Sequence, residues 1–409
     1  MEHSGKINLS LFHWSEIINL GILCFFYDVI NHWFFYIYGT VLLCIGVWKI
    51  FARIGQYAVF ENIGDSIQRC SLLSYIIFLS EFSLIFLCYT EVSISVPFIV
   101  TFSLTALMIL YINFQERINT GFVVPMFFIS LTALVIFFLM RSFSITTELI
   151  KITFVLGLIW LFDYRESYLG GFIMLIICCI LLVLNGESGS CFILMLGYDI
   201  FCFSSGEKKV IKTAGIITSL VIIAWLIIFS TPLYDIIYDM ITKILGKHES
   251  ICDSLHNSMK RVFFHYSSTD QLPLLHSLIN NQNIINKLTC TFSPAVFTEI
   301  VKYETGSTTS SADYCFSLIL YFLGPISGFI IAFSSLTAYS LSIRKNFSGR
   351  YRIIPLILYS QTLIHVFGNM MIFPFTGIPY PFLSFGNANL IINFAMIFIL
   401  THAELKEGC

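Results

Sequence analysis

Residues 360–390 read SQTLIHVFGNMMIFPFTGIPYPFLSFGNANL, an apolar stretch that prolines and glycines interrupt repeatedly. Proline ends or kinks a helix, so this density of breakers predicts a rigid hairpin where a spanning helix would otherwise continue. Non-helical backbone at membrane depth is tolerated only where protein buries it or where it lines a cavity. The stretch therefore indicates a re-entrant segment in a multi-pass membrane protein. Its hairpin residues are Pro374, Gly377, Pro379, Pro381 and Gly386.

The composition of the whole chain supports a membrane location. Of the 409 residues, 57% are hydrophobic and 11% are charged, against about 25% charged in soluble domains. Too few polar side chains remain to cover a surface in water. The net charge of −2, with 22 Lys and Arg thinly spread, also lacks the dense basic surface that phosphate binding requires. A soluble fold and a nucleic-acid partner are both excluded.

Apolar stretches recur along the chain with lengths near the roughly 20 residues that a spanning helix needs. They lie at 17–30, 33–52, 70–90, 93–114, 121–141, 147–163, 168–186, 189–204, 211–234, 314–342, 353–375 and 388–404. The first is short and could form one hairpin with the second, so we expect about 10–12 transmembrane helices. The predicted fold class is an all-α polytopic membrane protein with one large extracytoplasmic loop.

The basic residues predict the orientation of these spans. If the N-terminus is cytoplasmic, every short basic loop also falls on the cytoplasmic side, as the positive-inside rule requires, and so does the C-terminus. These loops carry Lys49, Arg53, Arg69, Arg117, Arg165, Lys208, Lys209, Lys212, Arg344, Lys345, Arg350, Arg352 and Lys406. The N-terminus has no pattern of a cleaved signal peptide, so none is expected.

A single integral membrane domain, 1–409, is expected, with four parts. The N-terminal spans occupy 1–143, and the central spans, with the ELIK and GESG motifs, occupy 144–234. The polar segment 235–312 forms the outer loop, and the C-terminal spans with the Pro-rich hairpin occupy 313–409. Within the outer loop, Cys252 and Cys290 could form a disulfide or remain reduced.

Four ionisable residues near the outer ends of spans are candidates for function, because each costs about 3 kcal/mol to insert. Glu148 and Lys151 are three residues apart on one helix face and can pair, either as a structural ion pair or as part of a site. Glu187 lies in a Gly-rich break that lines a cavity or forms a solvated turn. Asp313 begins a long helix, where it either caps the helix or acts chemically.

These regions together resemble the SEDS family, the FtsW/RodA/SpoVE membrane proteins that polymerise peptidoglycan from lipid II. Gln361 followed by PFTGIPYPFLSFG at 374–386 is similar to the family's Gln and its Pro-x-x-Gly-Ile-Pro-Leu-Pro-Phe-x-Ser-Tyr-Gly pattern. ITTELIK at 145–151 resembles Gln-Pro-Ser-Glu-Leu-Ala-Lys, and NGESGS at 185–190 resembles Gln-Pro-Asp-Leu-Gly-Thr. The segment 312–324 is similar to the family's Thr-Asp-Phe-Ile-Phe with its following Leu-Gly. The resemblance runs from about residue 140 to the end.

The chain also departs from the family pattern. The paired Glu before Leu-Gly is Tyr321-Phe322, and the Asn after the Gln is His365. The final Gly-Gly-Ser-Ser reads GNAN at 386–389. These differences leave room for a member without polymerase activity.

The resemblance implies glycosyl transfer from a lipid-linked glycan to lipid II at the outer face of the membrane. Asp313 would be the general base, while Lys151 and Arg261 would stabilise the leaving pyrophosphate, with a divalent cation (Mg²⁺ or Mn²⁺) as a further candidate. Glu148 would orient Lys151, and the Pro-rich hairpin would wall the groove for the lipid tails. The remaining residues assigned to substrate binding are Glu187, Gln361 and Ser384.

The resemblance also implies a bacterial cytoplasmic-membrane protein of cell-wall synthesis in division or elongation. Its expected partners are lipid II, undecaprenyl-linked glycan, membrane lipid and a class B penicillin-binding transpeptidase. Two other functions remain open: a non-catalytic scaffold that activates such a transpeptidase, and a flippase for the lipid-linked precursor.

Overall fold

The structure is a computed structural model of the 409-residue chain. It describes Thr40, Cys44, Leu104, 123–140, 143–164, 168–185, 187–204, 215–220, 223, 313–344, 351–370, 372, 377–384 and 387–407. These residues form helices and short turns, and no strand occurs among them. The predicted all-helical fold class is confirmed.

The described helices follow the predicted apolar stretches closely. They are α5 (Val123–Leu139), α6 (Phe143–Tyr164), α7 (Tyr168–Leu184), α8 (Ser188–Ser204), α16 (Cys315–Arg344), α17 (Ile353–Asn369) and α18 (Asn387–Glu407). Helix α6 begins four residues before the predicted 147, and α18 ends three residues after the predicted 404. The largest difference is at the end of α17, because the stretch predicted at 353–375 is helical only to Asn369. A proline ring at position 374 would clash with the carbonyl of Met370, four residues earlier, if the helix continued.

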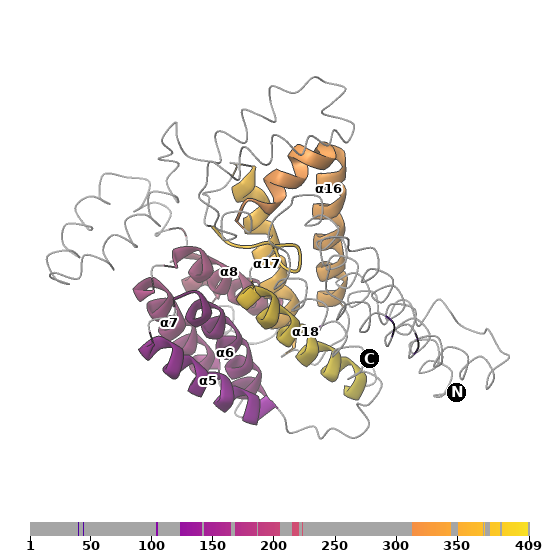
Figure 1. The fold of residues 1–409 in the computed structure, drawn as a ribbon. Coiled ribbons are helices and arrows are strands. Elements are labelled where there is room, and N and C mark those ends of the chain that lie inside the picture. The colour runs from indigo at the N-terminus through magenta and orange to yellow at the C-terminus, as the bar shows by residue number, and fades with distance from the viewer. Residues whose placement is uncertain are drawn as a thin grey trace, which may run out of the picture. The chain divides into compact units, whose positions relative to one another are not determined.

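The helices α5 to α8 pack in chain order, and α17 joins them through α8 (Figure 1). Helix α16 packs against α17, so α17 lies between α8 and α16. Small residues permit the close approaches: a Cβ atom at Gly197 on α8 would lie 2.5 Å from Cδ1 of Ile357 on α17. Helix α18 belongs to a separate compact unit, in which Asn393 Nδ2 donates to Asn389 Oδ1 at 3.1 Å.

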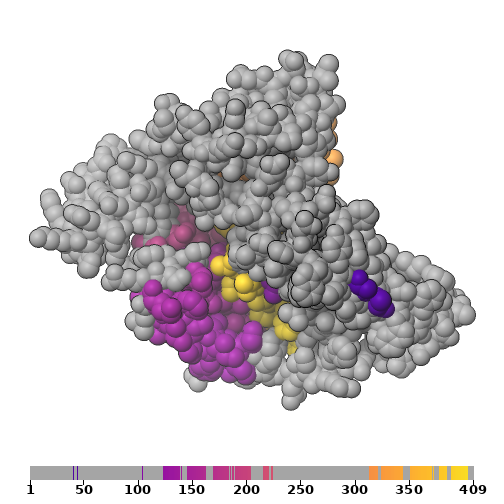
Figure 2. Space-filling model, viewed as in Figure 1, coloured from indigo at the N-terminus to yellow at the C-terminus, as the bar shows by residue number. Residues whose placement is uncertain are grey.

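Burial is distributed as in a helical membrane protein. Helix α6 is mostly buried, while α5 and α7 expose large apolar side chains, including Ile129 and Ile180. The exposed surface of α5 is visible in Figure 2. An apolar outer surface of this kind is stable in lipid and not in water. Among the described residues, Ile145–Phe162 and Gly324–Ile343 are long and apolar enough to cross a membrane.

Much of the predicted topology falls on residues outside those that the structure describes. These include most of 1–122, the outer loop 235–312 with its two cysteines and Arg261, and the hairpin residues Pro374 and Gly386. The span count, the four-part division and the cytoplasmic termini stay predictions.

Helix α16 is interrupted at Gly324, which has φ 79° and ψ 163° and is followed by Pro325. Only glycine adopts this conformation readily, and the extended ψ suits a residue before proline. The break divides α16 into a short first segment that starts beside Asp313 and a long second segment. Residue 324 therefore sets the direction in which the first segment leaves the second.

Replacing Gly324 by alanine is expected to lower the free energy of unfolding by about 1–3 kcal/mol, because the new Cβ atom makes this backbone conformation strained. Thermal unfolding of the detergent-solubilised protein measures the effect. Gly215→Ala is the control, since Gly215 is helical and its Cβ would come no closer than 3.1 Å to a neighbouring side chain. A melting temperature for Gly324→Ala at or above that of the control would contradict the prediction.

Candidate functional site

Glu148 and Lys151 form the ion pair that their spacing predicts. Lys151 Nζ lies 2.6 Å from Glu148 Oε1, and the two residues are 1% and 6% exposed. The contact has the distance of an ion pair without the alignment of a hydrogen bond. Among the described residues, neither Lys151 Nζ nor Glu148 Oε2 has a hydrogen-bond partner. The pair is thus buried on α6 with donor and acceptor capacity left over.

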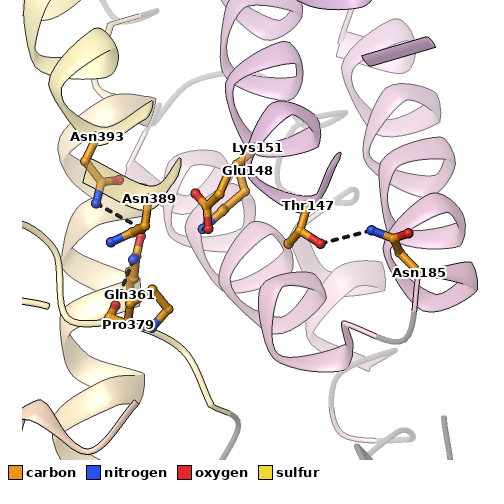
Figure 3. A network of polar contacts seen from close by, with 8 residues as sticks. All are labelled: Thr147, Glu148, Lys151, Asn185, Gln361, Pro379, Asn389 and Asn393. Carbon is orange, nitrogen blue, oxygen red and sulfur yellow. Dashed lines mark hydrogen bonds and ion pairs between the residues drawn. The ribbon is translucent and has the colours of Figure 1, made fainter. Parts of the chain in front are cut away.

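A neighbouring hydrogen bond joins α6 to the turn before α8. Asn185 Nδ2, at the end of α7, donates to Thr147 Oγ1 at 3.0 Å, and Figure 3 shows the two side chains facing each other. The next turn contains Glu187, whose N–H donates to the Leu182 carbonyl at 2.9 Å. Glu187 is half-buried at the start of α8, where the helix dipole favours a negative charge.

The described part of the Pro-rich hairpin, 377–384, is non-helical and largely buried. Two of its residues have left-handed backbone: Gly377, with φ 64°, and Phe382, with φ 62°. This conformation costs a bulky residue free energy, so the surrounding contacts must impose it on Phe382. The turn is closed by Tyr380 N–H donating to Ser384 Oγ at 2.6 Å and by Ser384 N–H donating to the Tyr380 carbonyl at 3.0 Å. The buried hydroxyl of Ser384 is thus engaged within the turn.

Helix α17 holds the hairpin through two buried side chains. Gln361 Nε2 donates to the Pro379 carbonyl at 2.9 Å (Figure 3). His365 Nδ1 contacts the Ile378 carbonyl, the preceding peptide. Two successive hairpin carbonyls that would otherwise be buried without donors are therefore satisfied by one helix.

Helix α16 holds the other side of the same hairpin. Tyr380, fully buried, donates its hydroxyl to Ser335 Oγ at 2.7 Å. Cys315 Sγ donates to the Leu383 carbonyl at 3.5 Å. The hairpin is therefore a fixed element of the bundle.

The start of α16, with Asp313, is bound by side chains from α17. The N–H groups of Phe316 and Ser317 donate to His365 Nε2 at 3.3 Å and to Asn369 Oδ1 at 3.2 Å. Asn369 Nδ2 donates to the carbonyl of Asp313 at 3.0 Å. The first N–H groups of a helix have no partners within it, and replacing a capping side chain costs about 0.5–2 kcal/mol. Here another helix supplies acceptors for two of them.

His365 and Asn369 were not assigned to the site from the sequence. The signal that could have identified them is their spacing: Gln361, His365 and Asn369 recur every four residues on one face of an apolar helix. All three are 2% exposed or less. Polar residues repeating along one face of a spanning helix indicate a polar partner within the bundle.

The predicted site residues therefore fall into two groups. One group lies on α16, α17 and the loop that both helices hold. Asp313 is at the start of α16 and Gln361 is on α17, while the loop contains Gly377, Pro379, Pro381 and Ser384. Glu148 and Lys151 belong to α6, and Glu187 directly precedes α8, which packs against both α6 and α17. No three His, Cys, Asp or Glu side chains gather as a metal site within the described residues. The divalent cation stays a prediction.

The fold resembles that of one chain in a solved structure of a peptidoglycan synthase complex. That structure is described as showing how the complex coordinates polymerization and crosslinking. The two chains share 13% sequence identity and a TM-score of 0.54, over 82% of this chain and 97% of the other. No family model and no curated protein matches the sequence. At this identity the similarity shows a shared fold.

Removing one member of the Glu148–Lys151 pair should destabilise the protein more than removing both. Glu148→Gln or Lys151→Met alone leaves an uncompensated buried charge and is expected to cost about 3–5 kcal/mol, whereas the double variant should stay within about 1 kcal/mol of wild type. Denaturant unfolding of the detergent-solubilised variants gives these values. Additive losses in the double variant would contradict a coupled pair.

Proposed function

We propose that this protein is a peptidoglycan glycosyltransferase that polymerises lipid II at the outer face of the bacterial cytoplasmic membrane. The observation that carries the proposal is the placement of Asp313, a half-buried carboxylic acid at the start of α16, beside a buried Pro-rich hairpin. The similarity in fold to a chain of a peptidoglycan synthase complex supports a role in peptidoglycan synthesis. The resemblance of four sequence regions to the SEDS family supports the specific reaction.

In the proposed reaction, the 4-hydroxyl of the acceptor lipid II attacks the anomeric carbon of the lipid-linked donor glycan. The Asp313 carboxylate accepts the hydroxyl proton as the new glycosidic bond forms. The bond from the anomeric carbon to the undecaprenyl pyrophosphate oxygen breaks, and the pyrophosphate leaves with the electron pair. Asp313 then returns its proton to solvent.

The leaving pyrophosphate requires positive charge, which we assign to Lys151 and Arg261. The buried Lys151 retains N–H donors beyond its contact with Glu148, and phosphate oxygens could accept from these. Glu148 restricts the position of Lys151 and neutralises its charge when no substrate is bound. Glu187 and Gln361 complete the proposed substrate-binding set, together with Ser384, which supports the hairpin wall.

A class B penicillin-binding transpeptidase is the proposed partner, because polymerised glycan strands must be crosslinked. The alternative is a scaffold that activates such a transpeptidase without catalysis. The replacement of the family's paired Glu by Tyr321-Phe322 favours this alternative. A flippase for the lipid-linked precursor is a third function, and it would bind the same precursor without needing a general base.

The decisive test compares polymerisation of purified lipid II by wild type and by Asp313→Asn, each with and without its transpeptidase. Loss of a general base is expected to lower kcat about 100-fold or more. Asp199→Asn is the matched control, since Asp199 is a half-buried carboxylic acid on α8 that accepts a hydrogen bond from Ser219 at 2.7 Å, which an amide oxygen can also accept.

Equal product from wild type and Asp313→Asn would overturn the catalytic assignment. A wild type that forms no polymer but stimulates crosslinking by its transpeptidase would favour the scaffold. Movement of fluorescent lipid II across vesicles by both proteins, without polymer, would favour the flippase.

A further inference from the structure

His365 and Asn369 connect the segment that contains Asp313 to the hairpin. His365 contacts the Ile378 carbonyl with Nδ1 and accepts from Phe316 N–H with Nε2. Because a carbonyl can only accept, Nδ1 carries the proton and Nε2 has the free lone pair. The imidazole is therefore neutral and in one tautomer. Its Nδ1 faces the hairpin, and its Nε2 faces the start of α16 and also lies 3.3 Å from Asn369 Nδ2.

Asn369 is also held by hydrogen bonds. Its Oδ1 accepts from the N–H of Ser317 at 3.2 Å and from Ser317 Oγ at 2.9 Å. Its Nδ2 donates to the carbonyls of Asp313 and His365, both at 3.0 Å. The donors and the acceptor of this amide thus all have hydrogen-bond partners within the protein. Rotating it by 180° would place its NH₂ group against Ser317 N–H.

These contacts restrain the backbone that follows the Asp313 side chain, from its own carbonyl onward. The carbonyl of Asp313 is held by Asn369, and the helix that follows is held at Phe316 and Ser317. Both α17 side chains are 2% exposed or less, so water does not compete for the hydrogen bonds. The backbone from which the carboxylate extends is thus fixed relative to α17 and the hairpin.

We propose that His365 and Asn369 are positioning residues, which hold Asp313 at the distance from the acceptor hydroxyl that proton transfer requires. This inference rests on the proposed glycosyltransferase function. Neither side chain is assigned a contact with substrate. Their effect arises because a general base displaced by about 1 Å can lose about 100-fold in rate.

The first measurement is independent of activity. Amide hydrogen exchange is followed on the full-length protein in nanodiscs, for peptides that contain Phe316 and Ser317. In His365→Leu and Asn369→Leu we expect these amides to exchange roughly tenfold faster or more than in wild type. Thr362→Val is the control: Thr362 is buried on the same helix, and its hydroxyl has no hydrogen-bond partner among the described residues.

The second measurement is steady-state lipid II polymerisation by the same proteins, normalised to the folded monodisperse fraction. We expect kcat to fall about 100-fold in both leucine variants, with KM within about threefold of wild type. His365→Gln retains one donor and one acceptor and should recover kcat to within about tenfold of wild type. A merely structural role would reduce the folded fraction and leave kcat of the folded protein unchanged.

Unchanged exchange of Phe316 and Ser317 in both leucine variants would overturn the inference. Retention of kcat by these variants, when Asp313→Asn has lost it, would also overturn the inference and would leave the proposed function standing. A wild type without polymerase activity would overturn the proposed function instead. In that case, faster amide exchange at Phe316 and Ser317 in both leucine variants would still support the restraint of the backbone at Asp313. Unchanged exchange would overturn that restraint.

Discussion

A backbone N–H or C=O group that is removed from water must find a hydrogen-bonding partner, and inside an apolar helix bundle that partner has to come from the protein. The start of α16 and the hairpin 377–384 both present such groups. His365 serves both segments, and Asn369 and Gln361 serve one each. Three side chains on one face of α17 therefore fix the relative positions of a helix start and a non-helical loop, on which the geometry around Asp313 depends.

The low polarity of the bundle interior also determines how charged side chains are accommodated there. Glu148 and Lys151 are buried in the bundle as an ion pair. Lys151 Nζ lies 2.6 Å from Glu148 Oε1, and both side chains are nearly inaccessible to solvent. An isolated charge there would be costly, whereas a paired one is tolerated and keeps unused hydrogen-bonding capacity. In the proposed reaction, the ammonium of Lys151 is already desolvated before the pyrophosphate leaves, because the pair is buried. The hydrogen bonds to the hairpin and the Glu148–Lys151 pair have the same physical cause: a polar group in an apolar interior needs a partner within the protein.

Much of the fold could be predicted from local sequence. The apolar stretches at 168–186 and 189–204 correspond to α7 and α8 within two residues at each end. The pairing of Glu148 with Lys151 followed from their three-residue spacing, because that spacing places them on one helix face. The end of α17 was predicted six residues too late, because hydropathy does not register the effect of Pro374 on the preceding turn. For the site, Asp313 and the hairpin were recognised from motifs. Asn369 was missed because its four-residue spacing from Gln361 and His365 indicates a shared helix face but not which distant group that face meets.

The sequence by itself determined that this is an all-helical membrane protein, where most of its described helices begin and end, and which pair of charges shares a face. These properties depend on residues within about one or two turns of each other, so local chemistry suffices. The tertiary structure alone decided what His365 and Asn369 bind, since their partners at the start of α16 lie 49 to 56 residues away along the chain. Only the packing of α17 against α16 brings these groups together, and that packing depends on side-chain shape over the whole interface.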